Sequence, residues 1–485
     1  MKSFYTLIFL FTTFTRVLLP QEFNSQKFYN SYPDYKDSNI KNKRFGHSGL
    51  VKKIKDIKKN GVFNVEIAGK SLQDREIFLL SIGEGKTKVL LWSQMHGDES
   101  TATMALFDLF NFFNANDSHN KFRKQLLKKI KIYFIPMLNP DGAEVYKRRN
   151  ALNIDLNRDA LRLEFPESRI LKTVRDSLKP KFAFNLHDQN TRYTAGNSYR
   201  SATISFLAPA YNYEKEINVV RGNTMKLIVN MYDELNKYIP GHVAKYKDDF
   251  EPRAFGDNFI KWGTSSVLIE SGGWKNDEEK QFIRKLNYIS ILTGLHSIAN
   301  KSYEKADIEI YKNIPFNDNL LFNLLLRNLT VKHKNKNYIV DIGINHEENN
   351  TIDQTQTFYQ GKIEDWGDLS IFYGYDELDL NGYEIRKSKV YDLPVHNLNE
   401  LDITKLLKKG YGFIRLGSLE INHEFSGLPF NLVLGDVEVK VDPEYNEFAN
   451  FTIWKDKELH YNIINGFIYD VKSEIEIKSN GLIFK

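Results

Sequence analysis

The sequence contains no cysteine among its 485 residues. This absence excludes disulfide bonds, thiolate metal sites and a cysteine nucleophile. A metal site would have to be built from histidine and carboxylate side chains. Histidine is itself scarce, with 11 residues in the chain, so each histidine that lies near a carboxylate can be considered individually.

The sequence also lacks a strong excess of charge of one sign. Its 67 basic and 62 acidic residues leave a formal net charge of +5, and no dense basic block is present. Because a nucleic-acid-binding surface normally needs such a block, nucleic acid is not expected as a partner. Hydrophobic residues make up 41% and charged residues 27% of the chain, which is typical of a globular protein and excludes general disorder.

Long apolar runs are missing after the first residues. No later stretch approaches the ~18 uninterrupted apolar residues of a transmembrane helix, so no membrane span is expected. The N-terminus reads MKSFYTLIFLFTTFTRVLLPQ, in which Lys2 precedes an apolar run from Phe4 to Phe14. This pattern predicts a signal peptide over residues 1–21 and export to the periplasm or the outside of the cell. A short amphipathic anchor is the alternative.

The periodicity of the remaining chain divides it into three parts. Residues 22–47 are polar and rich in Asn, Lys and Tyr, and are predicted to form a loose segment. Residues 48–303 alternate strand-like runs such as TKVLLWSQ with helical patterns such as TATMALFDLFNFF. This alternation predicts an α/β domain with a mixed, mostly parallel sheet flanked by helices. Residues 304–485 contain short β-like runs between turns and predict a β-rich, sandwich-like accessory domain.

The stretch WSQMHGDES places His96 and Glu99 three residues apart, after a buried strand and before a helix. That position is the C-terminal edge of a sheet, where α/β proteins hold their ligands. A second buried strand, FAFNLH, ends in His187 and offers a third donor. Two histidines and one glutamate are a common ligand set for catalytic zinc. Each of these residues taken alone is more often a packed or surface residue than a ligand.

Two further motifs contain polar residues suited to catalysis. The segment NPDGAEVYKRRNALNIDLNRDA contains Asn157 and Arg158, and an arginine can bind a carboxylate through two hydrogen bonds. The strand SSVLIESGG places Glu270 near its end, where a buried carboxylate is costly unless it is paired or acts as a base. A surface ion pair for Arg158, and an ion pair or a helix cap for Glu270, are the alternatives.

Taken together and in this order, the HxxE pair, NPDG, DLNR, the histidine of FAFNLH and the Glu-x-Gly of SSVLIESGG resemble the zinc carboxypeptidases, the carboxypeptidase A-like metallopeptidases. The resemblance covers roughly residues 48–303 and implies the fold of that family. It also implies one zinc ion per chain, held by His96, Glu99 and His187. By the same resemblance, Glu270 is the general base that takes the proton from a zinc-activated water.

The resemblance also implies roles for residues around the metal. Arg148 would polarise the scissile carbonyl, and Arg149 is the neighbouring alternative. Asp155 would orient His96 as the usual carboxylate partner of a ligating imidazole. Gly97 lies between the two first ligands, and we expect it to let the backbone approach the metal.

The resemblance further implies how a substrate is held. Asn157 and Arg158 would bind the C-terminal carboxylate of a peptide, and Tyr246 lies near the expected place of a mobile substrate-binding tyrosine. A surface aromatic is the alternative for Tyr246. The floor of a specificity pocket is expected near Asp257, and Arg253 is an unusual cation for that loop, with the hypothesis that it recognises an acidic group on the substrate.

The sequence therefore predicts an exported zinc metallocarboxypeptidase that hydrolyses the C-terminal peptide bond of peptides with a free C-terminal carboxylate. One alternative is a zinc amidase or deacylase acting on cell-wall peptides or acyl amino acids. Another is a catalytically inactive peptide-binding scaffold, against which the intact Glu270 argues.

Overall fold

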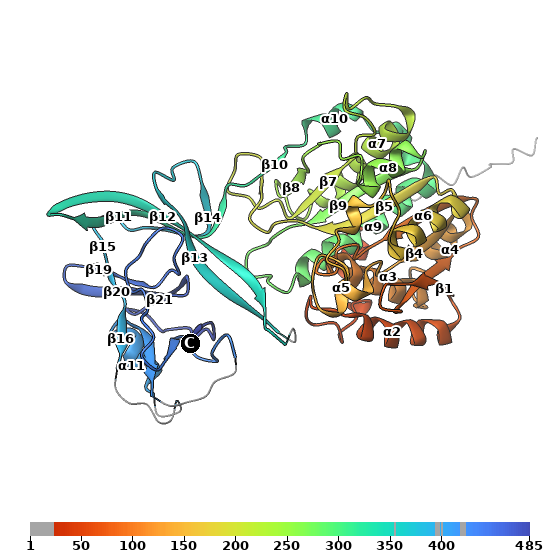
Figure 1. Cartoon of the computed structure of the whole chain (residues 1–485). Coiled ribbons are helices and arrows are strands. Elements are labelled where there is room, and N and C mark those ends of the chain that lie inside the picture. The colour runs from red at the N-terminus through yellow and green to blue at the C-terminus, as the bar shows by residue number, and fades with distance from the viewer. Residues whose placement is uncertain (1–23, 354–355, 393–397, 399–400, 418–422) are drawn as a thin grey trace, which may run out of the picture.

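The computed structural model describes residues 24–353, 356–392, 398, 401–417 and 423–485 (Figure 1). The signal peptide predicted for residues 1–21 lies outside these residues. Among the helices that the structure describes, none combines the length and the apolar character needed to cross a bilayer. The chain forms a sheet covered by helices, followed by a β-rich region.

The first part of the chain is built on an eight-stranded sheet with the order β1-β2-β4-β3-β5-β9-β7-β8. Its central strands β4, β3, β5 and β9 run parallel, whereas β1 and β2 pair antiparallel at one edge. This arrangement confirms the predicted mixed sheet. The strands are β1 (Asn64–Lys70), β2 (Glu76–Ile82), β3 (Thr87–Trp92), β4 (Ile130–Ile135), β5 (Phe182–Asp188), β7 (Ile204–Leu207), β8 (Val243–Lys245) and β9 (Ser265–Ser271).

Helices cover both faces of this sheet (Figure 1). Because side chains alternate between the two faces of a strand, Val89 and Leu91 of β3 join one apolar cluster and Leu90 and Trp92 join the other. Burial on both faces explains the continuous apolar strand runs in the sequence. The helices are α2 (His47–Asn60), α3 (Thr101–Asn114), α4 (Asn120–Lys129), α5 (Pro140–Glu144), α6 (Pro166–Leu178), α7 (Val219–Leu235), α8 (Phe255–Lys261), α9 (Gln281–Asn300) and α10 (Ile308–Asn313).

The segment that precedes α2 is packed, although its polar composition predicts a loose chain. It contains the helix α1 (Ser25–Ser31), and Phe28, Tyr32 and Tyr35 are buried in the same apolar cluster as α3 and α9. The guanidinium of Arg284 holds it in place by donating to the carbonyl oxygen of Ile40 at 2.7 Å. Spaced aromatic residues therefore anchor a segment in which polar residues outnumber them.

Arg284 also forms a fully buried ion pair with Asp108, in which Nε lies 2.7 Å from Oδ2. We expect Arg284→Ala to lower the free energy of unfolding by about 3–5 kcal/mol, because Asp108 would remain buried without its partner. Urea unfolding of the variant measures this loss, and the exposed Arg162→Ala serves as the matched control. A loss no larger than that of the control would contradict a structural role for the pair.

The second part of the chain is β-rich, as predicted. Its main sheet has the order β13-β12-β11-β15-β19-β20-β21, with β14 paired to β11. A smaller sheet of four parallel strands accompanies the helix α11 (Ile403–Lys408), an arrangement not expected from the short β-like runs. The strands are β11 (Leu321–His333), β12 (Lys336–Asn350), β13 (Thr357–Gly367), β14 (Tyr373–Asp379), β15 (Glu384–Lys387), β16 (Lys389–Tyr391), β17 (Tyr411–Leu416), β18 (Asn431–Leu434), β19 (Phe451–Lys455), β20 (Glu458–Ile464), β21 (Phe467–Asp470) and β22 (Ile483–Phe484).

The domain boundary between residues 303 and 304 remains a prediction. Beyond it, α10 packs against α7, and the short strand β10 (Asn317–Asp318) pairs with β6 (Thr194–Ala195). The long strands β12 and β13 reach back towards the first part of the chain (Figure 1). There, Glu348 forms an ion pair with Lys43, and the side chain of Asn350 donates to the carbonyl oxygen of Tyr146 at 3.0 Å.

Candidate active site

Three neighbouring parallel strands bring the predicted site residues to one edge of the sheet. His96 and Glu99 follow β3, His187 lies near the end of β5, and Glu270 lies near the end of β9. The register of β5 and β9 places His187 directly opposite Glu270. Because the carboxyl ends of parallel strands meet at one edge, residues that are far apart in the sequence share this position.

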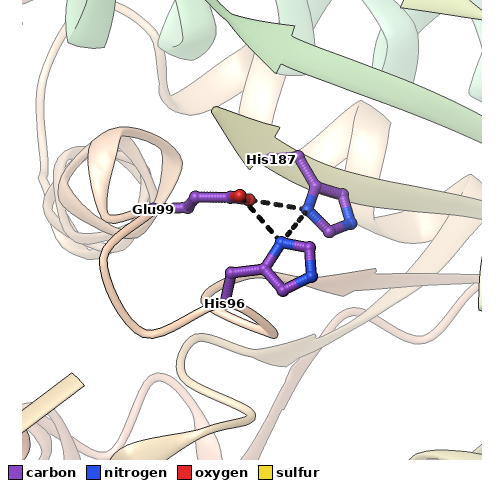
Figure 2. A group of neighbouring side chains, drawn as sticks. All are labelled: His96, Glu99 and His187. Carbon is purple, nitrogen blue, oxygen red and sulfur yellow. Dashed lines mark hydrogen bonds and ion pairs between the residues drawn. The ribbon is translucent and has the colours of Figure 1, made fainter. Parts of the chain in front are cut away.

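His96, Glu99 and His187 face one another at the centre of this edge (Figure 2). The Nδ1 atom of His96 lies 2.7 Å from Oε1 of Glu99, and Nδ1 of His187 lies 2.7 Å from Oε2 of the same carboxylate. The two Nδ1 atoms are 3.2 Å apart. All three side chains are buried, with exposed fractions of 2%, 7% and 3%.

This donor set fits a zinc ion. The three ligand atoms lie within 4.8 Å of one another, and two histidines with one glutamate leave a coordination position for a reacting molecule. The far ring nitrogen of His96, Nε2, lies 3.0 Å from Oδ1 of Asp155, which orients the ring so that Nδ1 faces the other two donors. The backbone N–H of Asp188 donates to Oε2 of Glu99 at 3.2 Å and helps to fix the carboxylate.

The charges of the cluster favour an ionised Glu99. Burial raises the pKa of this carboxyl, but the adjacent His96 and His187 lower it well below its usual value. Burial lowers the pKa of His96, yet Glu99 and Asp155 outweigh that effect and raise it overall. Burial lowers the pKa of His187. In the protein without metal, the cluster therefore consists of a carboxylate held by two imidazoles.

Gly97 lies at a close contact between two backbone segments, and its expected role in letting the backbone approach the metal stays a prediction. A side chain at this position would overlap the backbone of Gly142 and Ala143 in α5, so the glycine allows the segment after β3 to pack closely against this helix. The N–H of Gly97 donates to the carbonyl oxygen of Arg148 at 3.2 Å. The close approach is therefore between the segment after β3 and α5, and the hydrogen bond from Gly97 holds the backbone of Arg148 beside it.

Arg148 lies against the three-residue cluster, as the resemblance implies. Its Nη1 atom is 2.9 Å from Oε1 of Glu99, and its Nη2 atom is 3.1 Å from Oδ2 of Asp155. The neighbouring Arg149 instead donates to the carbonyl oxygen of Asn153 at 3.0 Å. Of these two arginines, Arg148 is therefore the one whose guanidinium contacts the cluster.

Glu270 is buried beside the cluster with an oxygen that has no partner. Its exposed fraction is 7%, and Oε2 accepts no hydrogen bond from the described residues. Burial raises its pKa well above the usual value, and the charges of Glu99 and Asp188 act in the same direction. Burial, together with Glu270, also raises the pKa of Tyr246, so that phenol lies within the electrostatic reach of the same carboxyl.

Asn157 and Arg158 lie next to the start of α8 and the loop that precedes it. Oδ1 of Asn157 accepts from the N–H of Phe255 at 2.9 Å. The Nε atom of Arg158 lies 3.3 Å from Oε2 of Glu251, so its guanidinium already faces a carboxylate. Arg253 donates to both oxygens of the same glutamate, at 2.9 and 2.8 Å, which places this cation in an internal ion pair.

Asp257 is buried in the first turn of α8, and burial raises its pKa to about 7. In the unfolded chain an aspartate titrates near ~3.9, so at intermediate pH the folded protein binds the additional proton. The free energy of unfolding should therefore increase, on the order of a few kcal/mol, as the pH falls from about 8 to about 5. We expect Asp257→Asn to weaken this dependence in denaturant titrations, since asparagine can still accept from the N–H of Glu251. Parallel pH profiles for Asp257→Asn and the exposed control Asp249→Asn would contradict this assignment.

Two polar residues that support the site were not identified from the sequence. Asp188 lies directly after His187 and accepts from the hydroxyl of Thr101 at 2.5 Å and from Nζ of Lys280 at 3.3 Å. The dipeptide His-Asp was a local signal for Asp188. Lys280 had no comparable signal, because it comes from the start of α9, which follows a different strand.

Comparisons with known proteins identify a family for part of the chain. Residues 51–235 match the zinc carboxypeptidase family model. The chain is 30% identical over 139 residues to carboxypeptidase 2 of Trichophyton tonsurans, which covers 28% of this chain and 24% of that protein. It is 25% identical over 256 residues to carboxypeptidase D of Rattus norvegicus, with 44% and 18% covered. The chain thus spans about a quarter or less of the length of these curated relatives.

A solved metallo-carboxypeptidase from Burkholderia cenocepacia is similar over 53% of this chain and 70% of its own, with 14% identity and a TM-score of 0.44. The range matched by the family model includes the cluster His96, Glu99 and His187 and ends before Tyr246 and Glu270. The chain therefore contains a domain of the zinc carboxypeptidase family, matched at residues 51–235.

Proposed function

We propose that the protein is a zinc-dependent metallocarboxypeptidase that hydrolyses the C-terminal peptide bond of peptides. The observation that carries this proposal is the buried cluster of two imidazoles and one carboxylate, with an unpartnered carboxyl oxygen of Glu270 and the guanidinium of Arg148 beside it. The family match supports the reaction class. Export, predicted from residues 1–21, belongs to the same proposal.

His96, Glu99 and His187 would hold the metal through Nδ1, a carboxylate oxygen and Nδ1. A zinc ion there would supply Lewis-acid polarisation of a carbonyl oxygen and a lowered pKa for a water molecule. Asp155 would keep the ring of His96 in the ligating orientation through its contact with Nε2. Burial of the cluster excludes bulk water, which strengthens every electrostatic interaction within it.

The remaining residues would orient the substrate and transfer protons. Arg158 would exchange its contact with Glu251 for the terminal carboxylate of the peptide, with Asn157 beside it. Arg148 would turn from Glu99 and Asp155 to donate to the oxygen that gains charge. Glu270 would accept a proton from the attacking water at its unpartnered Oε2 and donate it to the departing amine.

Mass spectrometry of a mixed peptide pool tests the proposal. Half of the peptides carry a free C-terminus and half an amidated one, and the purified, zinc-loaded protein is compared with a chelated sample. Shortening of the free peptides only, abolished by chelator, is the expected result. Cell-wall peptides and acyl amino acids form a second substrate set. Their cleavage without shortening of the peptide pool would move the assignment to an amidase. Bound zinc without turnover of either substrate set would favour a binding scaffold.

A further inference from the structure

A cleft of about 710 Å³ lies between the two parts of the chain and opens onto the metal cluster. One wall of the cleft contains Asp98 and Glu99, together with the segment after β5 that includes Arg192. The opposite wall comes from the β-rich region, with Asn349 of β12 and Tyr375 of β14. The β-rich region therefore forms part of the surface that a molecule bound at Glu99 would meet.

The position of this cleft indicates which part of a substrate would enter it. Two residues, Asn157 and Arg158, are proposed to hold the terminal carboxylate, and neither of them lines the cleft. The proposed metal ligand Glu99 does line it. If the peptide terminus lies at Arg158 and the cleaved bond at the cluster, the chain upstream of that bond extends into the cleft. This step rests on the proposed function.

Arg192 lines the cleft without an ion-pair partner among the described residues. The residue is half-buried, and its guanidinium forms no ion pair or hydrogen bond with any residue that the structure describes. Burial lowers its pKa, while Glu364 and Glu347 are close enough to oppose that shift without forming an ion pair with it. A desolvated guanidinium without a bound carboxylate is costly, and a ligand anion would remove that cost.

A second cation faces the same space from the C-terminal segment. Lys478 lines the cleft and forms no ion pair within the described part of the chain. Burial lowers the pKa of His346 to about 4, and the charges of Lys478 and Arg192 act in the same direction. Both cations therefore act electrostatically on the same imidazole, Arg192 from the segment after β5 and Lys478 from the C-terminal segment.

Several carboxylates that line the cleft already form ion pairs with lysines. Asp188 is held by Lys280, Glu348 by Lys43 and Asp376 by Lys275. Glu347, which also lines the cleft, lies 3.6 Å from Nζ of Lys362 across the β12–β13 pair. Of the other acidic residues in the lining, Asp277 accepts from the backbone N–H groups of Phe282 and Ile283, and Asp98 and Glu278 form no ion pair with a described residue. Arg192 and Lys478 take part in none of these pairs, which leaves both cations available to a negative group from a ligand.

We propose that the cleft between the two parts binds the substrate chain upstream of the cleaved bond, and that Arg192, supported by Lys478, recognises an acidic side chain there. The ligand class is a peptide with glutamate or aspartate N-terminal to the cleaved bond. The β-rich region thereby contributes to substrate selection. Arginine suits this task because its planar guanidinium can bind a carboxylate through two hydrogen bonds.

The test compares pairs of synthetic peptides that share one C-terminal residue. Within each pair a single glutamate is replaced by glutamine, and the position is moved residue by residue along the chain upstream of the cleaved bond. Hydrolysis gives kcat/KM, and fluorescence anisotropy gives the Kd of labelled peptides independently of turnover. The variants are Arg192→Gln and Lys478→Gln, with the exposed Arg162→Gln as a control of equal charge change.

At one of these positions, the full-length protein is expected to bind the glutamate peptide about tenfold more tightly than its glutamine partner, as one charge-assisted contact allows. Arg192→Gln should abolish this preference without changing affinity for the glutamine peptide, Lys478→Gln should reduce it, and Arg162→Gln should retain it. If no position shows a preference that depends on Arg192, the inference is overturned.

The two proposals fail in different ways. Hydrolysis of both peptides at equal rates and with equal affinity would refute the role of Arg192 and leave the carboxypeptidase proposal intact. Binding with an Arg192-dependent glutamate preference but without hydrolysis would refute the carboxypeptidase proposal and retain the cleft as an acidic-peptide site. Absence of measurable binding to any of the peptides would overturn the inference.

Discussion

Replacing Glu270 by glutamine is expected to lower kcat by about 10²- to 10⁴-fold, the range typical of losing a general acid–base. The amide keeps the size of the side chain but cannot accept a proton from water. The unpartnered Oε2 next to the cluster is the atom at which that proton would be received. Steady-state kinetics on a peptide with a free C-terminus, with bound zinc measured by mass spectrometry, checks the result.

Two further measurements, of metal content and of stability, distinguish a loss of catalysis in Glu270→Gln from a loss of structure. The metal content of Glu270→Gln should equal that of the unchanged protein, because Glu270 is not one of the three clustered donors. Burial disfavours the ionised carboxyl, so the metal-free variant should be at least as stable as the metal-free parent. A general base is expected to contribute at least ~10²-fold to the rate. If the activity of Glu270→Gln were within twofold of that of the exposed control Glu84→Gln, Glu270 would not be part of the mechanism.

Removing the metal is expected to abolish activity and to lower Tm. A ligand that binds only the folded protein stabilises it by about 2.7 kcal/mol at 100 times its Kd and about 4.1 kcal/mol at 1,000 times. The three donors converge only in the folded chain, because they come from the ends of β3 and β5. Scanning calorimetry with zinc and with chelator measures the difference in Tm, and readdition of zinc should restore both properties.

The variant His187→Ala should reproduce the effect of chelator, since it removes one of the three donors. Its zinc content should fall, and its Tm should no longer depend on added zinc. The exposed His333→Ala, at the end of β11, is the matched histidine control and should behave like the parent protein. Zinc binding by His187→Ala with the affinity of the parent would show that the metal lies elsewhere.

Local sequence patterns were enough to predict much of the first part of the chain. The alternation of apolar strand runs and amphipathic helices predicts the helix-covered sheet, because periodicity reflects which faces a segment buries. The order of the HxxE pair, DLNR and the histidine of FAFNLH indicated the family, and His96, Glu99 and His187 of these motifs converge in space. Such predictions succeed because each depends on a segment of a few residues and on the edge at which parallel strands end.

Other features depended on contacts between distant segments. The N-terminal segment is polar in composition, and only the apolar surface of α3 and α9 shows where Phe28 and Tyr32 are buried. The second sheet of the β-rich region is parallel, and parallel pairing leaves no short-turn signal in the sequence. In both cases burial and pairing are decided by partners that local periodicity does not reveal.

The sequence by itself determined the chemistry that is available to this protein. Without cysteine, metal ligands come from imidazoles and carboxylates, and the motifs name His96, Glu99 and His187 as candidates. Only the tertiary structure decided the surroundings of that cluster. The register of β5 and β9 places Glu270 opposite His187, and the β-rich region brings Lys478 to the cleft that contains Arg192. The reason is physical: residue identity is local, whereas desolvation and charge pairing depend on which distant segments pack together.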